Sequence, residues 1–221
     1  MDFNYAHNDT SRPERPSRTG CVNKLTVAGE EVQNIRRSAF ARSIPVSSDE
    51  TLQFICMQAA AVGAKNILEV GTAVGASGIA LLQTCPSARL TTIEKNEELF
   101  GEAVQNFQSA GLSSRVTALC GDAAEVMSTL GGGYDFIFLD GPKVQYVKWL
   151  PRLKELLARG GLLAADDVLL YGWVNGEEQP PKKRRMLVEH VREYLNAVTS
   201  DDGLITYIAD VGDGIALSVK K

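Results

Sequence analysis

Two short segments of the chain, residues 134–139 and 161–165, are largely apolar on both faces and bounded by glycine. Continuous apolar runs of this length are typical of buried strands in a parallel sheet. Asp140 directly follows the first segment, and Asp166 and Asp167 follow the second. Ligands of open α/β sheets gather where the parallel strands end, so we expect these three carboxylates to lie close together although they are distant in sequence.

An alternation of strand and helix patterns runs through the chain. We expect strands at about 66–70, 90–94, 116–120, 134–139 and 162–165, separated by helices near 77–84, 97–110, 123–130 and 147–158. Further helices are expected at about 24–42, from residue 49 onward and at about 183–198, and further strands at 204–209 and 215–219. The predicted fold class is α/β: a seven-stranded, mostly parallel, doubly wound sheet with an antiparallel C-terminal hairpin and helices on both faces.

The length of 221 residues suits one domain with a sizeable core. We expect a flexible arm at 1–22 followed by a single domain at 23–221. No apolar run approaches the length of a membrane span, and the polar start lacks the apolar stretch of a secretory signal, so a cytoplasmic protein is expected. The four cysteines are widely spaced, which disfavours both a zinc site and a disulfide framework.

A glycine-containing loop follows the strand expected at 66–70. Its glycines are Gly71, Gly75 and Gly78. The dinucleotide fingerprint needs glycine at the position of Ala73, so NAD binding is disfavoured. Missing side chains let the backbone approach a ligand, and the start of the following helix favours an anionic group such as a methionine-like carboxylate. The alternative is a purely structural turn.

Acidic residues at the next two strand ends extend this pattern. Glu94 ends the second expected strand, where a carboxylate can accept hydrogen bonds from two ribose hydroxyls. Asp122 and Ala123 follow the third strand, beside the place that an adenine ring would take. An acid after a strand is more commonly solvated or a cap of the next helix. Three such features at successive strand ends indicate a cofactor site.

Four motifs connect the chain to a known family. They are Ile-Pro-Val at 44–46, Asp-x-x-Lys-x-x-Tyr at 140–146, Asp-Asp-Val-Leu at 166–169 and Gly-Asp-Gly-Ile at 212–215. With them the chain resembles the cation-dependent, catechol O-methyltransferase-like branch of the S-adenosylmethionine methyltransferases, which have a Rossmann-like sheet. Within this branch it is especially similar to the bacterial tRNA 5-hydroxyuridine methyltransferases. The resemblance implies a homodimer, and a cofactor lined by Glu69, Gly71, Ser77, Glu94, Asp122 and Ala123, with Val46 or Ser47 over it and Asp140 nearby.

Asp140, Asp166 and Asp167 have no cysteine or histidine partner, and such a carboxylate set suits a hard cation like Mg²⁺. A cation there can hold two neighbouring acceptor oxygens, make a hydroxyl more acidic and aim it at a sulfonium methyl group. The family commonly has asparagine in place of Asp167, and the added carboxylate should bind a cation more tightly. The alternative is that Asp166 and Asp167 only cap a turn, with Asp167 in solvent.

Lys143 lies one turn beyond Asp140 and can take the hydroxyl proton if the metal and burial lower its pKa. The family resemblance supports this catalytic role, and the alternative is a surface lysine after a Gly-Pro turn. Tyr146 is expected to pack or to form a substrate wall. Trp173 is the best substrate-contact candidate among the aromatic residues, and His190 is assigned to packing or a dimer surface.

Three functional hypotheses remain open. The first is a Mg²⁺-assisted methyltransferase that uses S-adenosylmethionine to convert 5-hydroxyuridine in a tRNA anticodon loop to 5-methoxyuridine. The second keeps the chemistry but takes a small catechol-type acceptor. The third, motivated only by Asp167, is a cofactor-binding interaction protein without turnover. The net charge of −4 argues against indiscriminate polyanion binding, but basic segments within 11–42 and at 182–185 favour RNA over a small neutral phenol.

Overall fold

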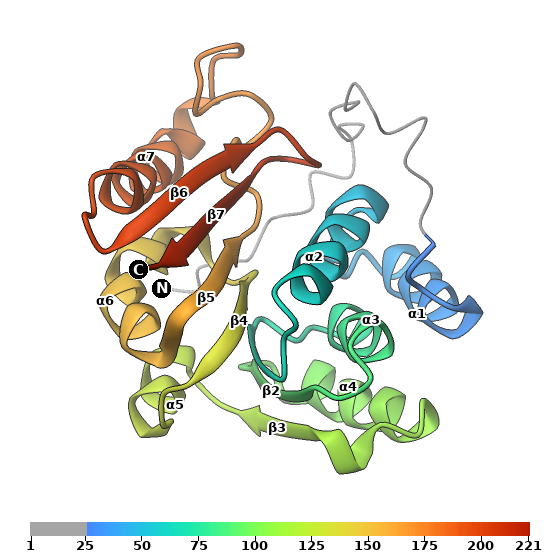
Figure 1. The fold of residues 1–221 in the computed structure, drawn as a ribbon. Helices are drawn as coiled ribbons and strands as arrows, with labels where there is room; N and C mark the ends of the chain where they lie inside the picture. The colour runs from blue at the N-terminus through green and yellow to red at the C-terminus, as the bar shows by residue number, and fades with distance from the viewer. Residues whose placement is uncertain (1–25) are drawn as a thin grey trace.

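The computed structural model describes residues 26–221, whose core is a seven-stranded sheet in the order β3-β2-β1-β4-β5-β7-β6 (Figure 1). The strands are β1 (Asn66–Val70), β2 (Arg89–Glu94), β3 (Val116–Cys120), β4 (Tyr134–Leu139), β5 (Leu157–Ala165), β6 (Leu204–Ala209) and β7 (Ile215–Lys220). Strands β1 to β5 pair in parallel, and β7 pairs antiparallel with both β5 and β6. The predicted mostly parallel sheet with an antiparallel C-terminal hairpin is confirmed.

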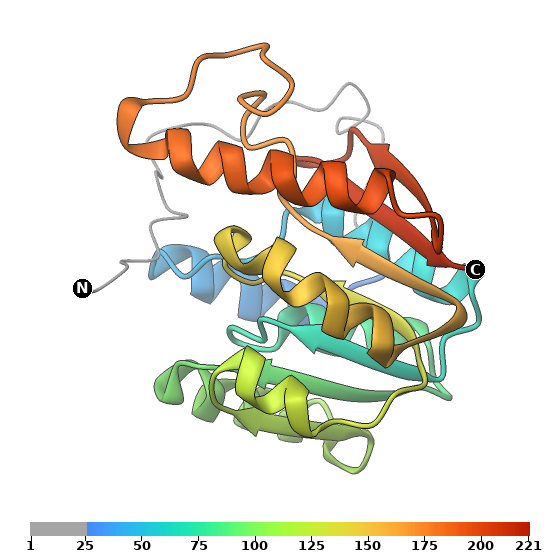
Figure 2. The same ribbon diagram turned by 90° about the vertical axis from the view of Figure 1, so that its left-hand side faces the viewer.

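Helices cover both faces of the sheet (Figure 2). They are α1 (Glu30–Ala41), α2 (Asp49–Ala61), α3 (Ala76–Thr84), α4 (Glu97–Ser109), α5 (Ala123–Thr129), α6 (Tyr146–Leu156) and α7 (Arg185–Thr199), with short 3₁₀ segments η1 (Ser113–Arg115), η2 (Lys143–Gln145) and η3 (Lys182–Arg184). Helices α1 to α4 share one hydrophobic core with Phe136 of β4, and α5 to α7 share another with Ile137. Both faces of the last four residues of β4, Phe136 to Leu139, are therefore buried, which explains why this part of the strand is apolar. Among the described helices, none is long and apolar enough to cross a membrane.

The largest differences from the predicted element boundaries are at the start of α1 and at the junction of α6 with β5, and several other boundaries differ by one or two residues. The expected arm at 1–22 and the first two residues of the helix predicted at 24–42 lie outside the described residues, and α1 begins only at Glu30. The backbone N–H groups of Thr26 and Val27 donate to Gln53 Oε1 at 2.8 and 3.2 Å, so this stretch is held by α2 instead of by helical bonds. The helix predicted to reach residue 158 ends two residues earlier because β5 already begins at Leu157.

The register of the central strands sets three chain segments side by side. Val70 of β1 is level with Leu139 of β4, which is level with Ala165 of β5. The pairing continues one residue further, because Asp140 N donates to Val70 O at 2.9 Å and Asp166 N donates to Leu139 O at 3.0 Å. The residues that directly follow β1, β4 and β5 are therefore neighbours at the carboxyl edge of the sheet, where ligands of such folds bind.

Candidate active site

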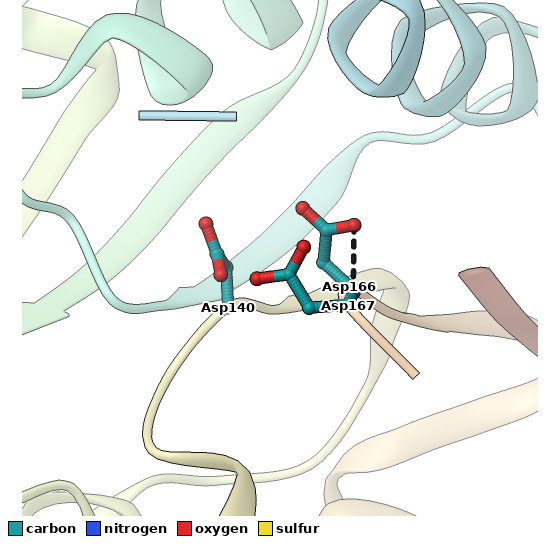
Figure 3. Close-up of side chains that lie close together, drawn as sticks. All are labelled: Asp140, Asp166 and Asp167. Carbon is teal, nitrogen blue, oxygen red and sulfur yellow. Dashed lines mark hydrogen bonds between the residues drawn. The ribbon is translucent and has the colours of Figure 1, made fainter. Parts of the chain in front are cut away.

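Three aspartates that follow β4 and β5 form a carboxylate cluster (Figure 3). One oxygen each of Asp140, Asp166 and Asp167 lies within 4.8 Å of the other two. Asp166 is 2% exposed, whereas the side chains of Asp140 and Asp167 are 24% and 30% exposed. Burial, together with the charges of Asp167 and Asp140, raises the pKa of Asp166 well above its usual range. A cation among these carboxylates would relieve their repulsion.

The backbone of Asp167 lies in the left-handed region, with a φ of 56°. Aspartate and asparagine adopt this conformation more readily than most residues with a Cβ. The turn brings the Asp167 N–H onto Asp166 Oδ1 at 2.9 Å and places Asp167 Oδ2 3.0 Å from Lys143 Nζ. The carboxylate of Asp167 therefore belongs to the cluster, and the alternative that it points into solvent is wrong.

Lys143 is buried beside the cluster, with 2% of its side chain exposed. Its Nζ lies 2.9 Å from Asp140 Oδ1 and 3.0 Å from Asp167 Oδ2, so the alternative of a surface lysine is wrong. Burial by itself lowers the pKa of Lys143, but the charges of Asp140 and Asp167 outweigh burial and raise that pKa well above its usual value. The ammonium group is thus the cation that balances the cluster in this arrangement.

The aromatic residues considered for substrate contact are mostly buried. Tyr146 has no exposed surface and donates from its hydroxyl to Leu139 O at 2.9 Å, so it packs in the core and does not form a substrate wall. Trp173 is 5% exposed and packs on Tyr171, with ring centroids 5.1 Å apart. Little of the indole is therefore available to a substrate. His190 is half-buried on α7 and lies outside the carboxylate cluster.

A cavity that is open to solvent lies between the glycine loop after β1 and the segment before α2. It is lined by Arg36, Pro45, Val46, Ser47, Leu52, Gly71, Thr72, Ala73, Val74, Ala76, Ser77 and Asp140. This set contains five of the residues that the resemblance implies for the cofactor: Val46, Ser47, Gly71, Ser77 and Asp140. Asp140 belongs to both the cavity and the cluster, and Ser47 Oγ donates to Asp140 Oδ2 at 3.4 Å. A ligand in the cavity would therefore lie beside a group held at the cluster.

The conformation of the loop requires glycine at two positions. Gly71 has a φ of 107°, and a Cβ there would lie 2.2 Å from the backbone oxygen of Asp140. Gly75 has a φ of 84° and is the N-cap of α3. Both positions therefore exclude ordinary side chains. Because Ala76 and Ser77 line the cavity, the positive end of the α3 dipole faces a bound ligand there.

Glu69 contacts Ser77, which follows the glycine loop, from inside the fold. It is not among the residues that line the cavity. Its side chain is fully buried, and it accepts hydrogen bonds from Ser77 Oγ and Thr92 Oγ1, both at 2.6 Å. Burial raises the pKa of Glu69 to about 7, against the lowering effect of these two hydrogen bonds. Glu69 therefore holds Ser77 in place and is a protonatable group inside the fold.

We expect Glu69→Gln to flatten the dependence of stability on pH. The folded pKa of about 7 is raised from an ordinary value of 4.5, so the stabilisation is fully present below pH 4.5 and is lost as pH rises through 7. Across this window the variant should gain up to about 3 kcal/mol of unfolding free energy relative to the wild type. Urea unfolding at several pH values measures this gain, with exposed Glu98→Gln as the baseline. Parallel curves for Glu69→Gln and the wild type would contradict it.

Glu94 ends β2, and Asp122 and Ala123 follow β3, at the same carboxyl edge of the sheet. None of the three is among the residues that line the cavity. Glu94 Oε2 accepts the backbone N–H of Ala73 at 2.9 Å and so anchors the glycine loop. Asp122 caps α5 by accepting a backbone N–H at 3.0 Å, and it pairs with Lys95 at 3.0 Å. The contacts of Asp122 match the alternative of a helix cap. Contacts of these residues with a nucleoside remain predictions.

The one cationic residue among the described residues of the cavity wall was not singled out from the sequence. Arg36 of α1 counted there only as part of a basic segment, because nothing in its spacing distinguishes it from Arg37. In the structure Arg36 lines the cavity, whereas Arg37 is exposed on the same helix. Only the packing of α1 against the segment before α2 separates the two arginines.

The fold and the site define a class: a Rossmann-like sheet with a cavity at its glycine loop and a carboxylate cluster beside that cavity. The model of the O-methyltransferase family matches residues 25–221. The chain is 35% identical over 179 residues to the catechol O-methyltransferase of Mycobacterium tuberculosis, covering 76% of this chain and 78% of that one. It is 30% identical over 181 residues to the caffeoyl-CoA O-methyltransferase of Citrus natsudaidai, covering 78% of each. A solved structure from Staphylococcus aureus gives a TM-score of 0.81 at 30% identity, covering 87% of this chain and 93% of that one. The chain belongs to the O-methyltransferase family.

Proposed function

We propose that this protein transfers the methyl group of S-adenosylmethionine to a hydroxyl oxygen of an acceptor held beside the carboxylate cluster. The observation that carries the proposal is that Asp140 forms part of both the cavity and the cluster. A cofactor in the cavity and an acceptor at the cluster would therefore meet at Asp140. Holding the two reactants in contact is a large part of the catalysis of a methyl transfer.

The cluster fits a hard divalent cation such as Mg²⁺. Asp140, Asp166 and Asp167 all offer oxygen, and their nearest oxygens lie within 4.8 Å of one another. When bound, Mg²⁺ would lower the pKa of an acceptor hydroxyl and hold it together with a neighbouring acceptor oxygen. The family commonly has asparagine at the position of Asp167. The third negative charge that Asp167 adds should therefore attract the cation more strongly.

Lys143 is placed to take the proton that the acceptor hydroxyl must lose. Burial alone would lower its pKa, and the pKa is high because the surrounding charges, those of Asp140 and Asp167 above all, outweigh that burial. Neutralising those charges leaves burial as the dominant effect, which lowers the pKa and frees the amine. The acceptor O–H then gives its proton to Nζ, the oxygen lone pair forms the O–CH₃ bond, and the C–S bond breaks to leave a neutral thioether.

The acceptor that we favour is 5-hydroxyuridine in a tRNA anticodon loop. The supporting observation is the basic run Lys182–Arg185, which lies at the end of the loop that starts after Asp167 and runs into the first residue of α7. Lys182, Lys183 and Arg185 are exposed. Exposed cations joined to the carboxylate cluster by a single loop can bind a phosphate backbone, which a small neutral phenol does not have.

The alternative acceptor is a small catechol-type molecule. The relatives named as catechol and caffeoyl-CoA O-methyltransferases favour it, because the chain covers about three quarters of each. Adjacent hydroxyls of a catechol would also offer two oxygens to a cation at the cluster. The third option, a cofactor-binding protein without turnover, has only the carboxylate of Asp167 in its favour.

The test is to incubate the protein with methyl-labelled S-adenosylmethionine and Mg²⁺, offering hydroxyuridine-containing tRNA from a methylation-deficient strain and a simple catechol in parallel. We expect label in a tRNA nucleoside, and none when excess chelator removes the cation. Reversing two charges, Lys182→Glu with Lys183→Glu, should lower tRNA methylation by about tenfold or more, because two phosphate contacts are lost. Lys148→Glu, which reverses the charge of one exposed lysine on α6, is the control for a charge reversal away from this run.

The outcomes separate the three hypotheses. Label only in the catechol would make this a small-molecule enzyme and would leave Lys182–Arg185 as a solvated helix start. Full activity in excess chelator would exclude the metal role of the cluster. Label in neither acceptor, with the cofactor bound, would favour the protein without turnover.

A further inference from the structure

Arg36 of α1 lies at the cavity wall with one donor of its guanidinium unsatisfied. The side chain is only 13% exposed. Its Nη1 pairs with Asp49, and its Nη2 donates to the carbonyl oxygen of Ser47 at 2.7 Å. Its Nε is buried and has no hydrogen-bond partner within the described part of the chain. Two contacts thus fix the guanidinium at the cavity wall while a third donor stays unsatisfied.

The charges around the cavity indicate which kind of ligand group this donor could bind. Among the described residues that line the cavity, Arg36 is the only cationic one, and Asp140 contributes a negative charge. Lys143, which belongs to the neighbouring carboxylate cluster, already pairs with Asp140 and Asp167. An anionic group entering the cavity would therefore find its favourable partners in Arg36 and the start of α3.

We propose that Arg36 binds the α-carboxylate of S-adenosylmethionine, with its Nε–H donating to a carboxylate oxygen. This inference rests on the proposed function, because it takes S-adenosylmethionine as the ligand of the cavity. A buried N–H of a charged group is costly when it is left without an acceptor, and a carboxylate is the acceptor that matches a guanidinium in charge and geometry. The contacts with Ser47 and Asp49 hold the guanidinium in position before the cofactor arrives.

The experiment compares two ligands that differ only in the carboxylate. S-adenosylmethionine and decarboxylated S-adenosylmethionine are titrated by calorimetry into the wild type, Arg36→Gln and Arg37→Gln, without acceptor, so that no turnover is needed. Arg37→Gln is the matched control, because it removes the same charge from an exposed position on the same helix. Thermal unfolding verifies that each variant is folded. Arg36→Lys, which keeps the charge but not the Nε–H, is the second variant should Arg36→Gln fail to fold.

We expect Arg36→Gln to lower the affinity for S-adenosylmethionine by about tenfold or more, which is the usual effect of losing a charge-assisted hydrogen bond. The affinity for the decarboxylated ligand should change by less than about twofold. Arg36→Lys should show a smaller loss with the same ligand selectivity, and Arg37→Gln should match the wild type. Equal weakening of both ligands would overturn the proposal, because Arg36 would then act only through Ser47 and the cavity wall. Unchanged binding of both ligands by Arg36→Gln would overturn it as well. Absence of binding to the wild type would instead refute the proposed function.

Discussion

Lys143→Met is expected to lower kcat for methyl transfer by about 10²–10⁴-fold, the usual contribution of a positioned general base. It should also reduce the unfolding free energy by about 2–3 kcal/mol at neutral pH. The reason is that Asp140 and Asp167 lose the buried ammonium that lies 2.9 and 3.0 Å away. This reduction in unfolding free energy is smaller than the one expected when a fully buried ion pair is broken, because both aspartates are partly exposed. Steady-state kinetics and urea unfolding measure the two effects.

The loss of stability should shrink as pH falls, because protonated carboxylates no longer repel one another once Lys143 is gone. Adding Mg²⁺ should restore part of the stability of Lys143→Met but not its kcat, since a cation can balance the cluster without taking the proton. Lys148→Met, an exposed lysine on the following helix, is the matched control for the loss of one charge. A kcat for Lys143→Met within about threefold of the wild type would show that the proton goes to another group.

Gly71→Ala is expected to damage both the fold and the site. The new Cβ would lie 2.2 Å from the backbone oxygen of Asp140, at a φ of 107° that residues with a Cβ rarely adopt. Strain and steric conflict together should lower the unfolding free energy by about 2–5 kcal/mol. Relief of the conflict would push Asp140 away from the cavity and the cluster, so cofactor binding should weaken by about tenfold or more. Urea unfolding and calorimetric titration of S-adenosylmethionine measure these effects.

Gly63→Ala separates the backbone strain from the steric conflict. Gly63 also has a positive φ, of 63°, but a Cβ there would have no heavy atom within 4 Å. This control should lose only about 1–2 kcal/mol and should bind the cofactor as the wild type does. Equal destabilisation of the Gly71 and Gly63 variants would mean that the loop can shift away from Asp140 at little cost.

The sequence alone determined the strands, most of the helices and the gathering of chemically active residues at one edge of the sheet. Apolar runs and glycine positions are local signals, because a buried strand must be apolar on both faces and a tight turn must tolerate a positive φ. Parallel strands end at the same edge of a sheet, so the sequence predicts Asp140, Asp166 and Asp167 at one edge, and the pairing of β4 with β5 makes them neighbours.

Only the tertiary structure decided the roles that depend on contacts between distant elements. The order of the strands, the burial of Lys143 between two carboxylates and the position of Glu69 beneath Ser77 could not be predicted from spacing. The selection of Arg36 over Arg37 for the cavity likewise depends on how α1 packs against the segment before α2. A residue type specifies which chemistry is available, but burial and neighbouring charges set its pKa and its partners, and those arise only when the helices close over the sheet.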